Sequence, residues 1–250
     1  MVTNSDLDLL FAAADIADRE SMRTWRSDDL EVEIKPDGSP VSATDKLIER
    51  LLRDLLAEHR PDDRIIGEEQ GETGSGSRCW VIDPIDGTGS YVEGGRGWGS
   101  LVALEVDGRP VAGMVTMPAL GQRWWGTLAD GAFFRDRPDS SPRRIAVSER
   151  SDDLRWSTLP EVDELDDAEL ARVARFEAVG RYVPRIEWTT YPPIMVADGS
   201  LDVAVQFGQH WDHAALAAVV VSAGGSISYD TAPADGARFA ASFTNGRVEP

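Results

Sequence analysis

Two segments near the N-terminus place their hydrophobic residues at the spacing of an α-helix. In the first segment, which follows Ser5 as a candidate N-cap, they are Leu7, Leu10, Phe11, Ala14 and Ala17. In the second, from about Thr44, they are Leu47, Ile48, Leu51, Leu52, Leu55 and Leu56. Each segment therefore predicts an amphipathic helix that packs on a core. The second helix should end before Pro61, and residues 35–41, rich in Gly, Pro and Ser, are expected to form a loop.

Short apolar runs replace the helical pattern in the middle of the chain. The expected strands are 64–67, 79–82, 100–106, 111–117 and 122–128. Asp107-Gly108 is typical of a tight hairpin turn, and Asp130-Gly131 is expected to form the next turn. The pattern predicts two short buried strands followed by an antiparallel meander.

Helices and strands alternate in the C-terminal part. We expect helices over 167–176 and 211–223, and strands over 201–206 and 226–229. The helix over 211–223 is apolar on all sides, which is typical of a helix buried between layers. The stretch most like a linker is 135–143. The order of the elements predicts an α/β (α+β layered) fold.

The charge of the chain narrows its functional class. The 250 residues include 44 Asp and Glu against 25 Lys and Arg, which gives a formal net charge of −19. Clustered basic residues bind nucleic acids and anionic membrane surfaces, so neither is an expected partner. The excess Asp and Glu residues either all lie on the solvated surface, or some of them converge to bind a metal ion.

Cysteine content and apolar runs bear on the location of the protein. Cys79 is the only cysteine, which excludes a disulfide within the chain and a zinc site of several cysteines. No apolar run reaches the roughly 18 residues of a membrane span, and the acidic N-terminal residues do not resemble a secretory signal. We therefore expect a cytoplasmic protein.

Candidate chemistry is concentrated in residues 80–88, Trp-Val-Ile-Asp-Pro-Ile-Asp-Gly-Thr. A buried strand delivers Asp83 at its end, and Pro84 should interrupt the ladder, which leaves the Ile85 carbonyl available as a ligand. Asp86 follows Asp83 closely enough for both carboxylates to share a cation. Such oxygen ligands suit Mg²⁺. The alternative is a turn in which the two aspartates act only as caps.

Other residues can complete such a site. Gly87 lets the backbone approach a ligand closely, and Thr88 offers a hydroxyl and an N–H. Glu68 follows the preceding short strand. Asp45 and Asp212 stand near the starts of helices, where a simple capping role is the alternative. Acids brought together from four segments would repel one another without cations, which favours a two-metal site.

These segments together resemble the inositol monophosphatase superfamily of Mg²⁺-dependent, lithium-sensitive phosphomonoesterases. The likeness is carried by Lys35-Pro36-Asp37, Pro40-Val41 and Asp45, by Gly67-Glu68-Glu69, by residues 80–88, and by Trp211-Asp212 with the helix that runs into Gly224-Gly225. All occur in the family's order, and Asp-Pro-Ile-Asp-Gly-Thr is highly specific to it. Trp98 to Leu104 and Arg123-Trp124-Trp125 resemble the histidinol-phosphate phosphatase branch more than the inositol phosphatases.

The resemblance implies an architecture, a cofactor and an assembly. The expected fold is a five-layer αβαβα sandwich, one phosphatase unit over 1–250 with a metal-site half, 1–145, and a substrate-side half, 146–250. The expected cofactor is Mg²⁺, two to three ions per active site, and the expected assembly is a homodimer.

The resemblance also assigns roles to individual residues. Glu68, Asp83 and the Ile85 carbonyl would hold one Mg²⁺; Asp83, Asp86 and Asp212 would hold a second; a third, weaker ion would lie near Glu68. The amides of Gly87 and Thr88 would bind the phosphate. Thr88, oriented by Asp45, would help to activate the attacking water, so the expected catalytic residues are Thr88, Asp45 and Glu68.

The chain departs from the family where the alcohol part of the substrate should bind. Ser90 stands in place of Asn, Glu187-Trp188 in place of a small residue and Asp, and Gln206 in place of a substrate-contacting Glu. Pro192-Pro193 falls inside an expected helix, where Pro193 would cost a hydrogen bond. The candidate substrate contacts are Ser90, Arg185, Glu187, Trp188 and Gln206. Trp188 either stacks on a flat group of the substrate or only packs beneath its loop.

The leading hypothesis is a Mg²⁺-dependent phosphatase that acts on a small-molecule phosphomonoester, either histidinol phosphate or a nucleoside or amino-sugar monophosphate. An inositol-1-phosphate phosphatase is the alternative, disfavoured by the missing Glu. A non-catalytic phosphate-binding relative is the alternative from another class. The complete set of candidate ligands argues against it.

Overall fold

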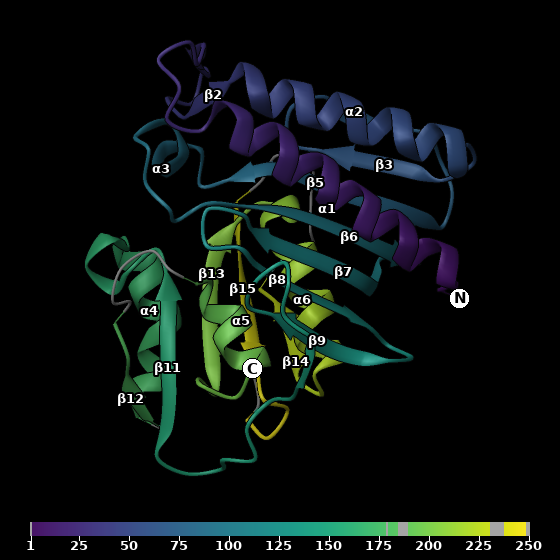
Figure 1. The fold of residues 1–250 in the computed structure, drawn as a ribbon. Coiled ribbons are helices and arrows are strands. Elements are labelled where there is room, and N and C mark those ends of the chain that lie inside the picture. Colours follow the sequence, from purple (N-terminus) through teal and green to yellow (C-terminus); the bar gives the residue numbers. More distant parts are fainter. Residues whose placement is uncertain (1, 179, 185–189, 231–237, 249–250) are drawn as a thin grey trace.

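The computed structural model describes residues 2–178, 180–184, 190–230 and 238–248 (Figure 1). The helices are α1 (Asn4–Thr24), α2 (Ala43–His59), α3 (Thr88–Val92), α4 (Asp167–Glu177), α5 (Pro192–Ala197) and α6 (His210–Ser222), with a 3₁₀ turn η1 (Val162–Glu164). The strands are β1 (Val32–Ile34), β2 (Pro40–Ser42), β3 (Arg64–Gly67), β4 (Gly71–Thr73), β5 (Arg78–Asp86), β6 (Gly99–Val106), β7 (Arg109–Met117), β8 (Gln122–Thr127), β9 (Gly131–Arg135), β10 (Arg143–Ile145), β11 (Leu154–Leu159), β12 (Gly180–Tyr182), β13 (Val203–Gly208), β14 (Ser226–Tyr229) and β15 (Phe239–Thr244).

Helices and sheets alternate in five layers (Figure 1). α1 and α2 pack on each other and cover one face of an eight-stranded sheet with the order β10-β9-β8-β7-β6-β5-β3-β4. α5 and α6 lie between this sheet and a five-stranded sheet with the order β12-β11-β13-β15-β14. α4 packs its buried residues on the outer face of the second sheet. The αβαβα sandwich expected from the resemblance is confirmed.

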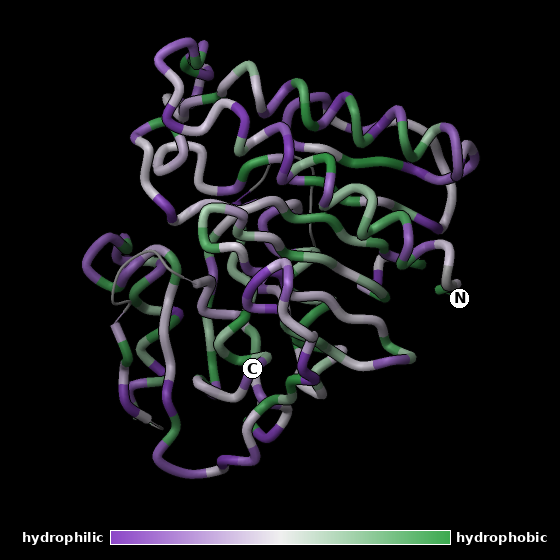
Figure 2. The backbone as a smooth tube through the Cα atoms, viewed as in Figure 1, coloured by the Kyte–Doolittle hydropathy of each residue, from purple (hydrophilic) through white to green (hydrophobic). Residues whose placement is uncertain are grey.

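α6 forms a core that both sheets share. Its residues from His213 to Val220 are all buried, and one hydrophobic cluster joins most of them to Val115 of β7 and Phe243 of β15. In Figure 2 hydrophobic residues concentrate on the strands and on the helix faces turned toward them. The predicted burial of this apolar helix between two layers is confirmed. Among the described residues, no helix is both long and apolar enough to cross a membrane.

Other expectations for local structure are also confirmed. α2 begins after Ser42, whose side chain accepts hydrogen bonds from the first helical turn, and ends before Pro61. The turn between β6 and β7 has positive φ at both Asp107 (52°) and Gly108 (70°), as a two-residue hairpin requires. Cys79 is buried in β5.

Four local expectations were wrong. The N-cap of α1 is Thr3 and not Ser5, which lies inside the helix. Residues 35–41 are not all loop, because β1 and β2 pair antiparallel with Pro40 opposite Ile34. The stretch 135–143 connects β9 to β10, which pair with each other, so it is a hairpin connection and not a linker. Pro192 and Pro193 occupy the first two positions of α5, where a helix has no need of their missing N–H groups.

Candidate active site

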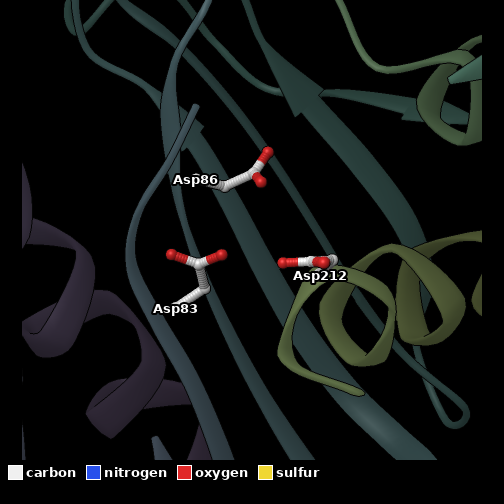
Figure 3. A group of neighbouring side chains, drawn as sticks. All are labelled: Asp83, Asp86 and Asp212. Atoms are coloured by element: carbon white, nitrogen blue, oxygen red, sulfur yellow. The ribbon is translucent and has the colours of Figure 1, made fainter. Parts of the chain in front are cut away.

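β5 contains an irregularity that brings two aspartates to the same side. Asp83 pairs with Leu101 of β6, and pairing resumes at Asp86 opposite Gly99, so β5 has one residue more than its partner in this interval. The predicted interruption of the ladder at Pro84 is confirmed. Residues three apart in a regular strand point to opposite faces, and the bulge removes that difference. Both carboxyl groups therefore border a common space (Figure 3).

Asp212 joins the pair from the first turn of α6 (Figure 3). One carboxylate oxygen from each of Asp83, Asp86 and Asp212 lies within 4.8 Å of the other two. Gln209 is the N-cap of α6, and its N–H donates to the Asp212 carboxylate at 2.6 Å. Asp212 thus stabilises the start of its helix and contributes to the acidic cluster at the same time.

Asp83 is buried without a proton donor. The residue is 1% exposed, and no N–H or O–H group of the described residues donates to either of its carboxylate oxygens. Burial raises the pKa of Asp83 well above its ordinary value, and the carboxyls of Glu68, Asp86 and Asp212 raise it further. Burial, followed by the charge of Asp86, raises the pKa of Asp212 to about 8. Such a group of buried acids requires bound protons or a cation, so these oxygen ligands fit a metal ion.

Glu68 faces the same space from the turn after β3. It lines one pocket with Asp83 and Asp212, and burial raises its pKa. Lys35, from the turn between β1 and β2, donates from Nζ to Glu68 Oε1 and Glu69 Oε1, each at 2.7 Å. These hydrogen bonds raise the pKa of Lys35 although burial opposes them. This contact of Lys35 could not be predicted, because it depends on how the β1–β2 hairpin folds over the turn after β3.

Thr88, Asp45 and Ile85 form a hydrogen-bonded group beside the acidic cluster. Thr88 Oγ1 lies 2.9 Å from the Ile85 carbonyl oxygen and 3.2 Å from Asp45 Oδ1, so its single proton can be donated to either. Asp45 is fully buried, accepts a hydrogen bond from Ser42 N at 2.9 Å, and has its pKa raised by burial to about 6. The predicted proximity of Thr88 to Asp45 is present, and the Ile85 carbonyl also has a donor in Thr88.

Gly87 turns the chain from β5 into α3. Its φ of 81° lies in the left-handed region that favours glycine. A Cβ at this position would lie 2.7 Å from the carbonyl oxygen of Gly97. Both constraints require glycine here, and they bring the backbone of Gly87 and Thr88 to the edge of the acidic cluster.

A second pocket adjoins the cluster on the side of the five-stranded sheet. It is lined by Asp86, Gly87, Gly97, Met117, Leu159, Pro160, Thr190, Tyr191, Gln206, Phe207 and Asp212. Gln206 of β13 is 2% exposed; its Nε2 donates to the Asp212 carbonyl oxygen at 3.3 Å, and its Oε1 has no hydrogen-bond partner among the described residues. The apolar lining residues were not predicted, because they come from the ends of four separate segments.

The remaining candidate substrate contacts lie elsewhere. Ser90 Oγ accepts a hydrogen bond from Gly97 N at 3.2 Å, and Ser90 does not line this pocket. Arg185, Glu187 and Trp188 are outside the described residues. Of the five candidate contacts, the structure therefore brings Gln206 alone, among the residues it describes, to the pocket beside the acidic cluster.

The acidic cluster fits a metal and lies beside a pocket in an αβαβα sandwich, an arrangement in which a cation and a small ligand can be held together. The model of the inositol monophosphatase family matches residues 2–238, and the chain belongs to that family. It is a phosphoric monoester hydrolase.

Individual relatives agree with this assignment. The chain is 40% identical over 241 residues to the histidinol-phosphatase of Streptomyces coelicolor, covering 89% of this chain and 86% of the relative. It is 36% identical over 238 residues to the histidinol-phosphatase of Mycobacterium tuberculosis, covering 91% and 88%. Among solved structures, an inositol monophosphatase from Zymomonas mobilis matches with a TM-score of 0.77 at 26% identity, covering 98% of this chain and 94% of that one.

Proposed function

We propose that this protein is a Mg²⁺-dependent phosphatase that hydrolyses the phosphate monoester of a small metabolite, with histidinol phosphate as the leading candidate. The observation that carries the proposal is Asp83, a buried carboxyl without a donor that lies among three other acids. The name of the relatives at 40% and 36% identity supports the choice of ester.

The acidic cluster would hold the metal. Asp83, Asp86 and Asp212 already place their oxygens within 4.8 Å of one another. Glu68 and the Ile85 carbonyl line the same pocket and would complete a set of two to three sites. All these ligands are oxygens, which favours Mg²⁺ over softer metals. When bound, Mg²⁺ neutralises charge on the phosphoryl oxygens and on the departing alkoxide, and acidifies the attacking water.

Asp45 and Thr88 provide a route for a proton. Thr88 Oγ1 can donate to Asp45 Oδ1 at 3.2 Å and then accept a proton from water on its other side. The raised pKa of Asp45, about 6, leaves it mostly ionised near neutral pH and thus able to accept this hydrogen bond. The amides of Gly87 and Thr88 would bind the phosphate, because Gly87 lets the backbone approach the cluster closely.

Gln206 and its apolar neighbours would bind the alcohol part of the substrate. Gln206 Oε1 is a buried acceptor beside Asp212, so a ligand N–H or O–H would satisfy it. Met117, Leu159 and Phe207 offer apolar contact to a flat ring.

A substrate panel tests the proposal. With Mg²⁺ present, we expect release of inorganic phosphate from histidinol phosphate with a higher kcat/KM than from inositol-1-phosphate or a nucleoside monophosphate. The highest kcat/KM with inositol-1-phosphate would favour the alternative substrate instead. If no ester of a broad panel released phosphate, the protein would be a non-catalytic relative and the proposal would be wrong.

A further inference from the structure

We infer that Glu49 is a positioning residue of the metal site, because its carboxylate accepts hydrogen bonds from the backbone of the turn 68–70 and so fixes the direction of Glu68. The inference rests on the proposed function, in which Glu68 is a metal ligand. Glu49 itself does not line either pocket of the site.

The contacts of Glu49 are made with the backbone of this turn. Glu49 lies on α2 and is fully buried, with 0% of the residue exposed. Its Oε2 accepts a hydrogen bond from Glu69 N at 2.7 Å, and its Oε1 accepts one from Gln70 N at 3.0 Å. The preceding amide, Glu68 N, donates to the Ile82 carbonyl oxygen of β5 at 3.2 Å. Three successive amides are therefore fixed, the first by the central sheet and the next two by Glu49.

Arg53 holds the carboxylate in place and extends the network. Its Nε donates to Glu49 Oε1 at 2.8 Å, one helical turn along α2. Its guanidinium also donates to Thr73 Oγ1 at 2.9 Å and to the Gly71 carbonyl oxygen, both in β4. A buried carboxylate is costly unless it is paired and hydrogen-bonded, and these three donors satisfy Glu49. The network connects α2 to the second half of the 68–70 turn and to β4, which follows it.

Gly67 provides the room for this approach. A Cβ at Gly67 would overlap the Glu49 carboxyl group, although the φ of Gly67 is not in the left-handed region. Glycine is thus required here by the close approach of Glu49 and not by backbone strain. The hydrogen bonds of Glu49 to the turn therefore depend on glycine at position 67. Substitution of either residue should let the turn that carries Glu68 move.

Direct metal binding tests the inference. Free Mn²⁺ is measured by electron paramagnetic resonance as it is titrated into the full chain without substrate. A glutamine has one acceptor oxygen where the carboxylate has two, so Glu49→Gln leaves at least one donor of the network unpaired. We expect Glu49→Gln and Gly67→Ala each to raise the Kd for Mn²⁺ about tenfold or more, as is typical when the partner of a metal ligand is removed.

Two control variants separate positioning from general damage. Glu58→Gln removes an exposed charge from the same helix, and Leu52→Ala removes a fully buried side chain from α2 without touching the turn. Both should leave the Kd for Mn²⁺ unchanged at a temperature where circular dichroism shows every variant folded. If Glu49→Gln does not fold, Gly67→Ala carries the test alone.

The outcomes are distinguishable. An unchanged Kd in folded Glu49→Gln or Gly67→Ala would overturn the role of Glu49, and so would an equal rise in Leu52→Ala. If the unaltered protein bound no Mn²⁺, the proposed function would fail and this inference with it. Weakened binding in Glu49→Gln and Gly67→Ala alone supports both.

Discussion

Asp83 carries a cost in stability when no metal is bound. Its carboxyl is 1% exposed and lies beside Glu68, Asp86 and Asp212, all of which raise its pKa after burial itself. Folding alone would favour a neutral side chain of the same shape at this position. A residue that is unfavourable for the fold and close to a pocket indicates a functional site.

Asp83→Asn should therefore make the metal-free protein more stable. In the presence of a chelator we expect the free energy of unfolding to rise by about 1 kcal/mol or more, which corresponds to relief of a shift of one pKa unit. Added Mg²⁺ should raise the Tm of the unaltered protein but not that of the variant. Thermal unfolding with and without Mg²⁺ measures both effects. Asp54→Asn, which removes an exposed charge from α2, serves as the control and should behave like the unaltered protein.

The sequence located the ligands better than the residues that support them. Asp83, Asp86 and Asp212 could be predicted because an acid after a strand or at a helix start has a definite local position. Lys35 and Glu49 could not, because each acts on the turn 68–70 from a different segment of the chain. Their contacts depend on how the β1–β2 hairpin and α2 pack, which local patterns do not specify.

The turn between β5 and α3 is the element on which the proposed phosphate site depends. Gly87 combines a φ of 81° with a Cβ position 2.7 Å from the Gly97 carbonyl oxygen. Gly108 has a φ of 70°, but no atom lies within 4 Å of its Cβ position. Substituting Gly87 and Gly108 in turn therefore separates two contributions to the loss of stability. Gly108 reports the left-handed backbone conformation alone, and Gly87 reports that conformation together with the close contact.

We expect Gly87→Ala to destabilise the protein by about 2–5 kcal/mol, the sum of the cost of a left-handed residue and the cost of overpacking. Its phosphate release should fall as the turn moves. Gly108→Ala should cost only about 1–2 kcal/mol and leave kcat unchanged. Chemical denaturation and a phosphate assay on both variants check this. Equal loss of activity in the two variants would contradict the account of the turn.

Elements with a strong local pattern were predicted, and elements without one were missed. β6 and β7 have apolar runs joined by Asp107-Gly108. β11 was missed because Ser157 and Thr158 are polar residues buried in its centre. β15 was missed because Ala240, Ala241 and Ser242 are small residues with no clear alternation. In β5, Pro84 predicted that the ladder is interrupted, but not that β5 has one residue more than β6 there, since the bulge is defined by pairing with β6.

The molecule as a whole is organised around α6, which carries Asp212 into the space bordered by β5. α6 lies very close to the eight-stranded sheet at Gly113 of β7, where a Cβ would be 2.8 Å from the Ala215 carbonyl oxygen and 2.7 Å from Ala218 Cβ. The distance between the two halves of the acidic cluster therefore depends on packing far from the cluster. The layers of the sandwich and the site are coupled.

Gly113→Ala tests this coupling. We expect a loss of about 1–3 kcal/mol of stability from overpacking and, because α6 must move away from β7, weaker Mg²⁺ binding. Gly180→Ala is a matched control, since its Cβ would press on Leu154 at the edge of the other sheet and would not touch α6. Isothermal titration with Mg²⁺ compares the variants. Mg²⁺ affinity reduced equally in Gly180→Ala would contradict the dependence on α6.

The acidic residues behind the net charge of −19 divide into two groups. Most of the acidic side chains lie on the surface, but Glu68, Asp83, Asp86 and Asp212 share one pocket. An anionic phosphate ester would be repelled from this pocket until cations occupy it. Hydrolysis of a phosphate ester at this pocket should therefore depend on a metal, whichever ester is the substrate.

The most direct test is phosphate release by chelator-treated protein as Mg²⁺ is added back, measured with the best ester of the panel. We expect no release without metal and a saturable recovery with Mg²⁺. We also expect activity at least about 100-fold lower in Asp83→Asn, because a metal ion typically contributes several kcal/mol to transition-state stabilisation. Equal rates of phosphate release in chelator and in Mg²⁺, or full activity of Asp83→Asn, would contradict the account.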